Sequence, residues 1–257
     1  MQMQKRQWGW RKEMHALLDA TDPAASKPSL PKGKYVVLIP HSDDEWIGNS
    51  TLISNHDYEV VLYNMNRQGG DNAELHAERL DEMKNIAASY GRELRTYYNE
   101  NDLSQFLTRY KPDCVLLPCF IDWHEEHIEV NDIFFQISKA NSMDDILVGM
   151  YQVTVPFSLA NITHVNPMLR TQWKNKWSKF RKTYRTQSNF PWYRVACNER
   201  IQGSLFNSYA AEVYTVYPIN RWQSIFEKKR LTKDWMEEIK NKLYSLIEIR
   251  QVKMPSL

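Results

Sequence analysis

An imidazole and three carboxylates fall within five residues of this chain, directly after a short apolar run. Residues 35–40 are rich in β-branched and apolar side chains, which is typical of a buried strand. His41, Asp43, Asp44 and Glu45 follow, at the strand end where open α/β folds place their ligands. Burying so many ionisable groups is costly unless a cation or a reaction uses them. This segment is therefore a candidate site.

A second cluster of the same kind follows another apolar run. Residues 114–118 predict a buried strand, and the next polar segment is Asp122-Trp123-His124-Glu125-Glu126-His127. Strands of one parallel sheet bring their carboxyl ends to the same edge. The two clusters are therefore interpreted as the two halves of one metal site.

His41 and Asp44 lie three residues apart on a predicted turn, which lets both side chains converge, and His127 is the first candidate for a third ligand. Two imidazoles and one carboxylate are a usual ligand set of catalytic zinc, with one position left to water. Such a metal lowers the pKa of its water to about 7. Asp43 is then a candidate general base, and His124 a candidate for polarising a carbonyl or protonating a leaving amine.

Other interpretations compete for the same residues. A His–Asp pair at a strand end is often a local hydrogen bond, and the Asp-Asp-Glu run by itself is compatible with magnesium. A nucleotide-binding module without catalysis would need a glycine-rich turn such as G-x-G-x-x-G after the first strand. The turn here is acidic and would repel a pyrophosphate. The pairing of two clusters favours a metal.

Strand and helix patterns alternate along the first 155 residues. Strands are predicted at 35–40, 59–65, 94–98, 114–118 and 146–155, and helices at 3–20, after residue 45, and at 72–90, 102–110 and 127–140. This alternation predicts an α/β, Rossmann-like fold whose sheet is mostly parallel and has helices on both faces. Later patterns predict helices at 174–187 and 232–252 and a strand at 211–216. We expect an N-terminal helix and linker in residues 1–33 and one α/β domain with a C-terminal helical extension in 34–257.

Composition narrows the class of protein. The chain has 257 residues, of which 42% are hydrophobic and 25% charged, as in ordinary globular proteins. A net charge of +2 gives no reason to expect nucleic acid as a partner. Three cysteines without a CxxC pair fit a reducing compartment. The absence of an apolar run of about 18 residues or of a secretory signal predicts a cytoplasmic protein without a transmembrane segment. The oligomeric state stays open.

Two motifs resemble the signatures of a known family. Residues 40–45, Pro-His-Ser-Asp-Asp-Glu, resemble the PHPDDE signature of the PIG-L/LmbE deacetylases, and residues 124–127, His-Glu-Glu-His, resemble its HPDH signature. The family includes N-acetylglucosaminyl-phosphatidylinositol de-N-acetylases and the deacetylases of mycothiol and bacillithiol synthesis. Residues 79–82 are similar to its R-x-x-E element, and residues 184–187 to a Tyr-x-Ser-Gln element. The resemblance covers residues 34 to 190.

The resemblance implies a role for each matching residue. It implies His41, Asp44 and His127 as ligands of zinc or another divalent metal, Asp43 as the base, and His124 as the residue that stabilises the oxyanion. Ser42 replaces the proline of the first signature, and Glu125-Glu126 replace Pro-Asp in the second. Glu126 then stands where an aspartate orients the preceding histidine, with one more methylene.

The implied reaction is hydrolysis of an N-acetyl group from an amino sugar or its conjugate, nucleotide- and lipid-linked forms included. Asn66, Arg67 and Arg79, on or near the loop after the second strand, are candidate substrate-binding residues. Two alternatives stay open: an amidase acting on a thiol-sugar conjugate, and a non-catalytic sugar-binding family member. The remaining histidines, at positions 15, 56, 76 and 164, are expected to be structural or exposed, and the residues after Gln187 are expected to shape the substrate pocket.

Overall fold

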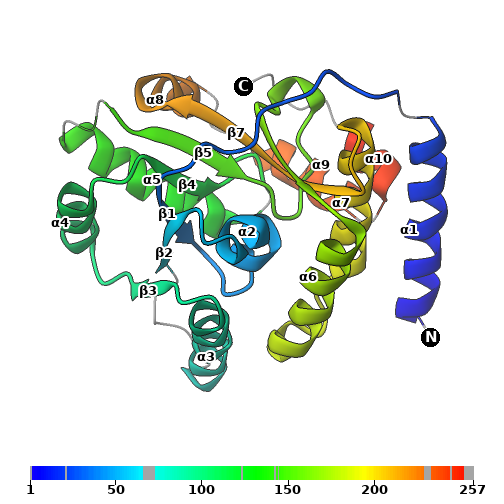
Figure 1. The fold of residues 1–257 in the computed structure, drawn as a ribbon, viewed down its shortest axis with the longest axis horizontal. Helices are drawn as coiled ribbons and strands as arrows, with labels where there is room; N and C mark the ends of the chain where they lie inside the picture. Colours follow the sequence, from blue (N-terminus) through cyan, green and yellow to red (C-terminus); the bar gives the residue numbers. More distant parts are fainter. Residues whose placement is uncertain are drawn as a thin grey trace.

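The computed structural model describes residues 2–20, 22–65, 73–122, 124–141, 143, 145–228, 233–243 and 245–251. A seven-stranded sheet with the order β3-β2-β1-β4-β5-β7-β6 forms its centre (Figure 1). The strands are β1 (Lys34–Ile39), β2 (Glu59–Asn64), β3 (Glu93–Thr96), β4 (Cys114–Pro118), β5 (Leu147–Tyr151), β6 (His164–Met168) and β7 (Ala210–Pro218). Strands β1 to β5 pair in parallel, whereas β7 is antiparallel to both β5 and β6.

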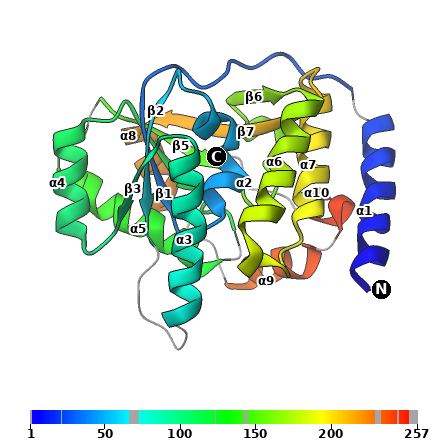
Figure 2. The same ribbon diagram turned by 60° about the horizontal axis from the view of Figure 1, so that its bottom comes forward.

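The described part of the chain also contains ten α-helices. They are α1 (Gln2–Asp19), α2 (Asp44–Ser54), α3 (Ala73–Ser89), α4 (Glu100–Tyr110), α5 (Glu125–Ala140), α6 (Arg170–Thr183), α7 (Trp192–Leu205), α8 (Ile219–Lys228), α9 (Lys233–Lys242) and α10 (Leu246–Gln251). Helices α6, α7 and α1 lie in a row beside the sheet (Figures 1 and 2). None of the helices in these described ranges is long and apolar enough to cross a membrane.

The side-chain alternation of β1 explains why both faces of the sheet are covered. Val36 and Leu38 are fully buried in a cluster formed with residues of α4, α5 and α8, whereas Val37 and Ile39 are buried against α2, α3 and α6. A strand that is apolar on both sides needs helices on both sides. The predicted α/β, Rossmann-like fold with a mostly parallel sheet and helices on both faces is confirmed.

Two predicted elements have different bounds in the structure. The strand predicted at 146–155 ends at Tyr151, because the side chain of Gln152 accepts the Phe157 N–H at 2.9 Å and the chain turns. The helix predicted at 174–187 begins at Arg170 and ends at Thr183, and a 3₁₀ turn at Arg185–Gln187 follows.

The prediction of a single helix at 232–252 is wrong, because the structure has two helices there, α9 and α10. Ser245 accepts the Glu248 N–H at 3.1 Å, as an N-cap residue does. Glu13 of α1 accepts the Leu246 N–H at 2.6 Å. These two contacts start a new helix that packs against α1.

The sequence pattern does not predict β6, α7 or α8. β6 contains Pro167, which is tolerated because this strand is at the edge of the sheet. α7 has buried residues on most of its sides, from Arg194 to Glu199 in succession. Such a helix lacks the apolar stripe by which a surface helix is recognised.

Successive strands of the chain are added to the sheet on opposite sides of β1. β2 and β3 extend the sheet on one side of β1, whereas β4 and β5 extend it on the other. In open α/β sheets, ligands bind at the carboxyl ends of the strands at such a switch point. Both predicted clusters follow strands that meet there, β1 and β4.

Candidate metal centre

Three buried or partly buried side chains converge at the switch point. Oδ2 of Asp44, in the first turn of α2, lies 3.1 Å from Nδ1 of His41 and 3.2 Å from Nε2 of His127, in the first turn of α5. The three donor atoms all lie within 4.8 Å of one another. Two nitrogens therefore face one carboxylate oxygen. The predicted set of His41, Asp44 and His127 is brought together.

The spacing of these donors fits a divalent metal. Ligands about 2.0 to 2.2 Å from a tetrahedral zinc are separated by roughly 3.3 Å, close to the distances observed here. Nε2 of His127 is fully buried and faces Oδ2 of Asp44 at 3.2 Å without forming a well-aligned hydrogen bond among the described residues, although a buried polar atom ordinarily makes one. A cation bound between the three side chains would supply a partner for this nitrogen.

Asp122 contacts the ring nitrogen of His127 that faces away from Asp44. Its Oδ2 lies 3.1 Å from Nδ1 of His127, and the Thr154 hydroxyl lies 3.2 Å from both carboxylate oxygens. Asp122 is almost completely buried. A carboxylate on the second nitrogen of a ligating histidine fixes the ring and its tautomer. The sequence placed Asp122 in the cluster without a role, and the structure gives it this contact.

Replacing Asp122 with asparagine should lower the affinity for zinc by about 10- to 100-fold, because the ring of His127 loses its charged acceptor. Competition with a fluorescent chelator measures this change. Asp81, an exposed residue on α3 whose carboxylate contacts only Lys84 among the described residues, provides the matched control, Asp81→Asn. Equal zinc affinity in the Asp122 and Asp81 variants would contradict the assigned contact.

The carboxylates shift the pKa of both imidazoles upward. Burial opposes the protonated form of His41, but the nearby carboxylates of Asp44 and Glu126 raise its pKa to about 9. Burial likewise opposes the charge on His127, but Asp122 and Asp44 raise its pKa to about 10. Burial acts to raise the pKa of Asp44, yet the two imidazoles outweigh it and hold that pKa below its usual range.

Metal affinity should therefore rise steeply with pH. Below about pH 9 both His41 and His127 are protonated in the metal-free protein, and a metal displaces both protons when it binds. The apparent affinity should increase by up to about 100-fold per pH unit between pH 6 and 8. Calorimetry in buffers of different ionisation enthalpy measures the protons released. A pH-independent affinity without proton release would show that these imidazoles are not the ligands.

Asp43 lies in the same pocket as the three donors and is 4% exposed. Burial, together with the nearby charges of Asp44 and Glu45, raises its pKa well above the usual value. The cationic groups of His41 and Arg79 act in the opposite direction. A carboxylate with a raised pKa beside a metal site is suited to accept a proton.

His124 and Glu126 are the more exposed residues of the site. Oε2 of Glu126 lies 3.9 Å from Nδ1 of His124 and 3.7 Å from Nε2 of His41, beyond direct hydrogen-bond distance in both cases. The ring centroids of His124 and His41 are 5.1 Å apart. Glu126 therefore faces both imidazoles, and its orienting role toward His124 stays a prediction. His124, Glu126 and His41 form a second donor set, which is wider and more exposed than the first.

A pocket of about 460 Å³ opens over these residues. Arg79 lines it, as expected for a substrate-binding residue, whereas Asn66 and Arg67 lie outside the described residues. His76 also lines it, although the sequence predicted a structural or exposed residue there. Arg194 lines it too, in the segment after Gln187 that was expected to shape the pocket. The positions of His76 and Arg194 in the pocket depend on how α3 and α7 pack. No local sequence motif indicates this packing. The pocket is lined by His41, Asp43, Asp44, His76, Arg79, His124, Glu126, Val153, Thr154, Gln187, Phe190, Pro191, Arg194 and Leu243.

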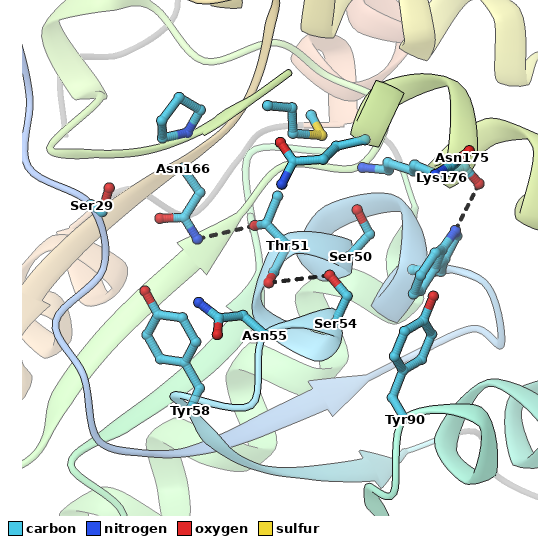
Figure 3. Close-up of a pocket in the computed structure, with 14 residues that line it drawn as sticks. Ser29, Ser50, Thr51, Ser54, Asn55, Tyr58, Tyr90, Asn166, Asn175 and Lys176 are labelled. Carbon is cyan, nitrogen blue, oxygen red and sulfur yellow. Dashed lines mark hydrogen bonds between the residues drawn. The ribbon is translucent and has the colours of Figure 1, made fainter. Parts of the chain in front are cut away.

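A second pocket, of about 500 Å³, lies beside the C-terminal half of α2 (Figure 3). Hydroxyl and amide side chains such as Thr51, Asn55 and Asn166 line it. Among its described lining residues only Lys176 is charged, and its ammonium contacts Glu199 at 2.5 Å and Glu212 at 2.6 Å. This lining lacks the imidazoles and carboxylates that gather around His41, Asp44 and His127.

Comparison with solved structures gives the same architecture. The chain is similar to the conserved protein TT1542 from Thermus thermophilus, with 16% identity, a TM-score of 0.55, and coverage of 70% of this chain and 93% of that one. It is also similar to a deacetylase of teicoplanin biosynthesis solved in complex with teicoplanin, with 12% identity, a TM-score of 0.53, and coverage of 73% and 99%. The likeness establishes the fold. No protein-family model matches the sequence, and no curated protein does.

Proposed function

We propose that this protein is a metal-dependent hydrolase that removes the N-acetyl group from an N-acetylated amino sugar or its conjugate. One observation carries the proposal: the donors of His41, Asp44 and His127 converge in a pocket that Asp43 and His124 also line. The likeness in fold to a deacetylase solved with teicoplanin supports it.

Each side chain has a distinct part in the proposed reaction. Zinc or another divalent metal, when bound by His41, Asp44 and His127, supplies a Lewis acid that acidifies water and polarises a carbonyl. Asp43 accepts the proton of the attacking water. His124 stabilises the negative charge that develops on the amide oxygen, which is commonly the largest contribution in such reactions. Arg79 lines the pocket and would contact the sugar or its conjugate.

Acetate release from a panel of N-acetylated amino sugars tests the proposal. The panel contains free sugars, nucleotide-linked sugars and lipid-linked sugars, each incubated with the zinc-loaded protein with and without a chelator. We expect release from at least one substrate and its loss with the chelator. A folded, zinc-loaded protein that releases no acetate from any of them would contradict the proposal. Hydrolysis of a thiol-sugar conjugate would then point to the amidase, and binding without turnover to a non-catalytic protein.

A further inference from the structure

Glu45 is the third carboxylate of the first cluster, and the proposed chemistry does not use it. Its side chain is fully buried. One oxygen, Oε2, accepts the backbone N–H of Asp43 at 2.9 Å, and the other, Oε1, accepts a short hydrogen bond from the hydroxyl of Tyr184. Glu45 therefore connects the residue after α6 with the backbone of the candidate base.

Asp43 has a backbone conformation that needs such support. Its φ angle is 136°, in a region that residues other than glycine rarely adopt. Backbone strain of this kind persists only where the surroundings impose it. The carbonyl of Asp43 accepts the N–H groups of Trp46 and Ile47 at 3.0 and 2.9 Å, so this residue also starts α2.

The carboxylate of Asp43 does not cap α2, although Asp43 is the N-cap residue of that helix. Aspartate at an N-cap ordinarily accepts a backbone N–H of the first turn, but Asp43 makes no such side-chain bond. Glu45, the second residue of the helix, instead accepts the N–H of the N-cap residue, a bond that the third residue accepts in a capping box. The reciprocal hydrogen bond, from a backbone N–H of the first turn to the side chain of Asp43, is not made. The Asp43 carboxylate is thus available to the pocket.

Tyr184 is itself held by the turn that follows it. The N–H and the hydroxyl of Thr186 donate to the carboxylate of Glu82 on α3, at 3.0 and 2.6 Å. The amide of Gln187 donates to the Ser42 carbonyl at 3.5 Å. The turn is therefore fixed to α3 and to the loop after β1, and it places the tyrosine hydroxyl against Glu45.

We propose that Tyr184 and Glu45 are positioning residues that set the conformation of Asp43. The hydroxyl of Tyr184 orients the Glu45 carboxylate, and that carboxylate holds the N–H of Asp43 so that its side chain faces the metal centre. This inference rests on the proposed function, because it assigns Asp43 as the base. Neither Tyr184 nor Glu45 lines the pocket among the described residues.

Kinetics of Tyr184→Phe, Glu45→Ala and Glu45→Gln test the proposal. We expect kcat to fall by about 10- to 100-fold in Tyr184→Phe, with unchanged KM and zinc content, because the ligands and the pocket lining are intact. Glu45→Gln keeps a carbonyl oxygen for the Asp43 N–H, so it should retain more activity than Glu45→Ala. Tyr35→Phe is the matched control, since this buried hydroxyl donates to the Pro31 carbonyl, near the opposite end of β1.

A crystal structure of the Glu45→Ala variant gives a readout that needs no substrate. We expect the φ angle of Asp43 to become negative and its carboxylate to turn away from His41. An unchanged Asp43 would overturn the proposal, as would a wild-type kcat in Tyr184→Phe. If Glu45→Ala does not fold, the structure of Tyr184→Phe provides the same test. A wild-type protein that releases no acetate, with the Asp43 backbone relaxed in the variant, would contradict only the proposed function.

Discussion

Asp43→Asn should lower the rate of acetate release by about 10²- to 10⁴-fold, while the protein keeps its metal. Loss of a general base typically has an effect of this size, and asparagine cannot accept the proton. Asn resembles Asp in shape and, like Asp, tolerates positive φ better than most residues. The variant is therefore expected to fold, and kcat measured at saturating zinc tests the result.

Zinc content and melting temperature are the controls for Asp43→Asn. Both should match the wild type, because Asp43 is not a member of the His41, Asp44 and His127 donor set. Normal turnover at saturating zinc would remove Asp43 from the mechanism. A loss of zinc together with activity would instead make Asp43 a ligand.

His127→Ala should lose both zinc and activity. The imidazole is fully buried, and its two nitrogens face Asp44 and Asp122. Removing it deletes a proposed ligand and takes away the imidazole that Asp44 and Asp122 both contact. Zinc affinity should fall by more than the roughly 10- to 100-fold expected for an outer contact, and acetate release should drop to background at micromolar zinc.

His56→Ala is the matched control, since His56 is exposed. Elemental analysis after dialysis against a weak chelator measures zinc retained by each protein. Retention of one zinc per chain by His127→Ala, at wild-type affinity, would show that the metal binds elsewhere. The more exposed set of His41, His124 and Glu126 would then be the next candidate.

The convergence of His41, Asp44 and His127 was predictable because the pattern that marks them is local. An apolar strand followed by His41 and Asp44, and another followed by His127, have their ends at one sheet edge once the strands are parallel neighbours. β1 and β4 pair directly in the structure, so the sequence prediction of converging clusters holds. The catalytic roles of Asp43, His124 and Glu126 stay predictions.

The supporting contacts were not predictable because they join distant segments. Asp122 is braced by Thr154, and Glu45 by Tyr184, which lies 139 positions away in the sequence. Neither pairing follows from hydrophobic periodicity, which specifies only the side of an element that is buried. The division of the C-terminal region into α9 and α10 was not predictable for the same reason. Glu13 of α1, far away in the sequence, accepts the Leu246 N–H at the start of α10.

The position of β7 affects the order in which the chain can fold. β7 (Ala210–Pro218) lies between β5 and β6, both of which precede it in the sequence. During synthesis, β5 and β6 therefore emerge before the strand that joins them. Unpaired strand edges promote association between chains. A nascent chain that pauses before residue 210 leaves the outer edge of β5 unpaired and open to pairing with another chain.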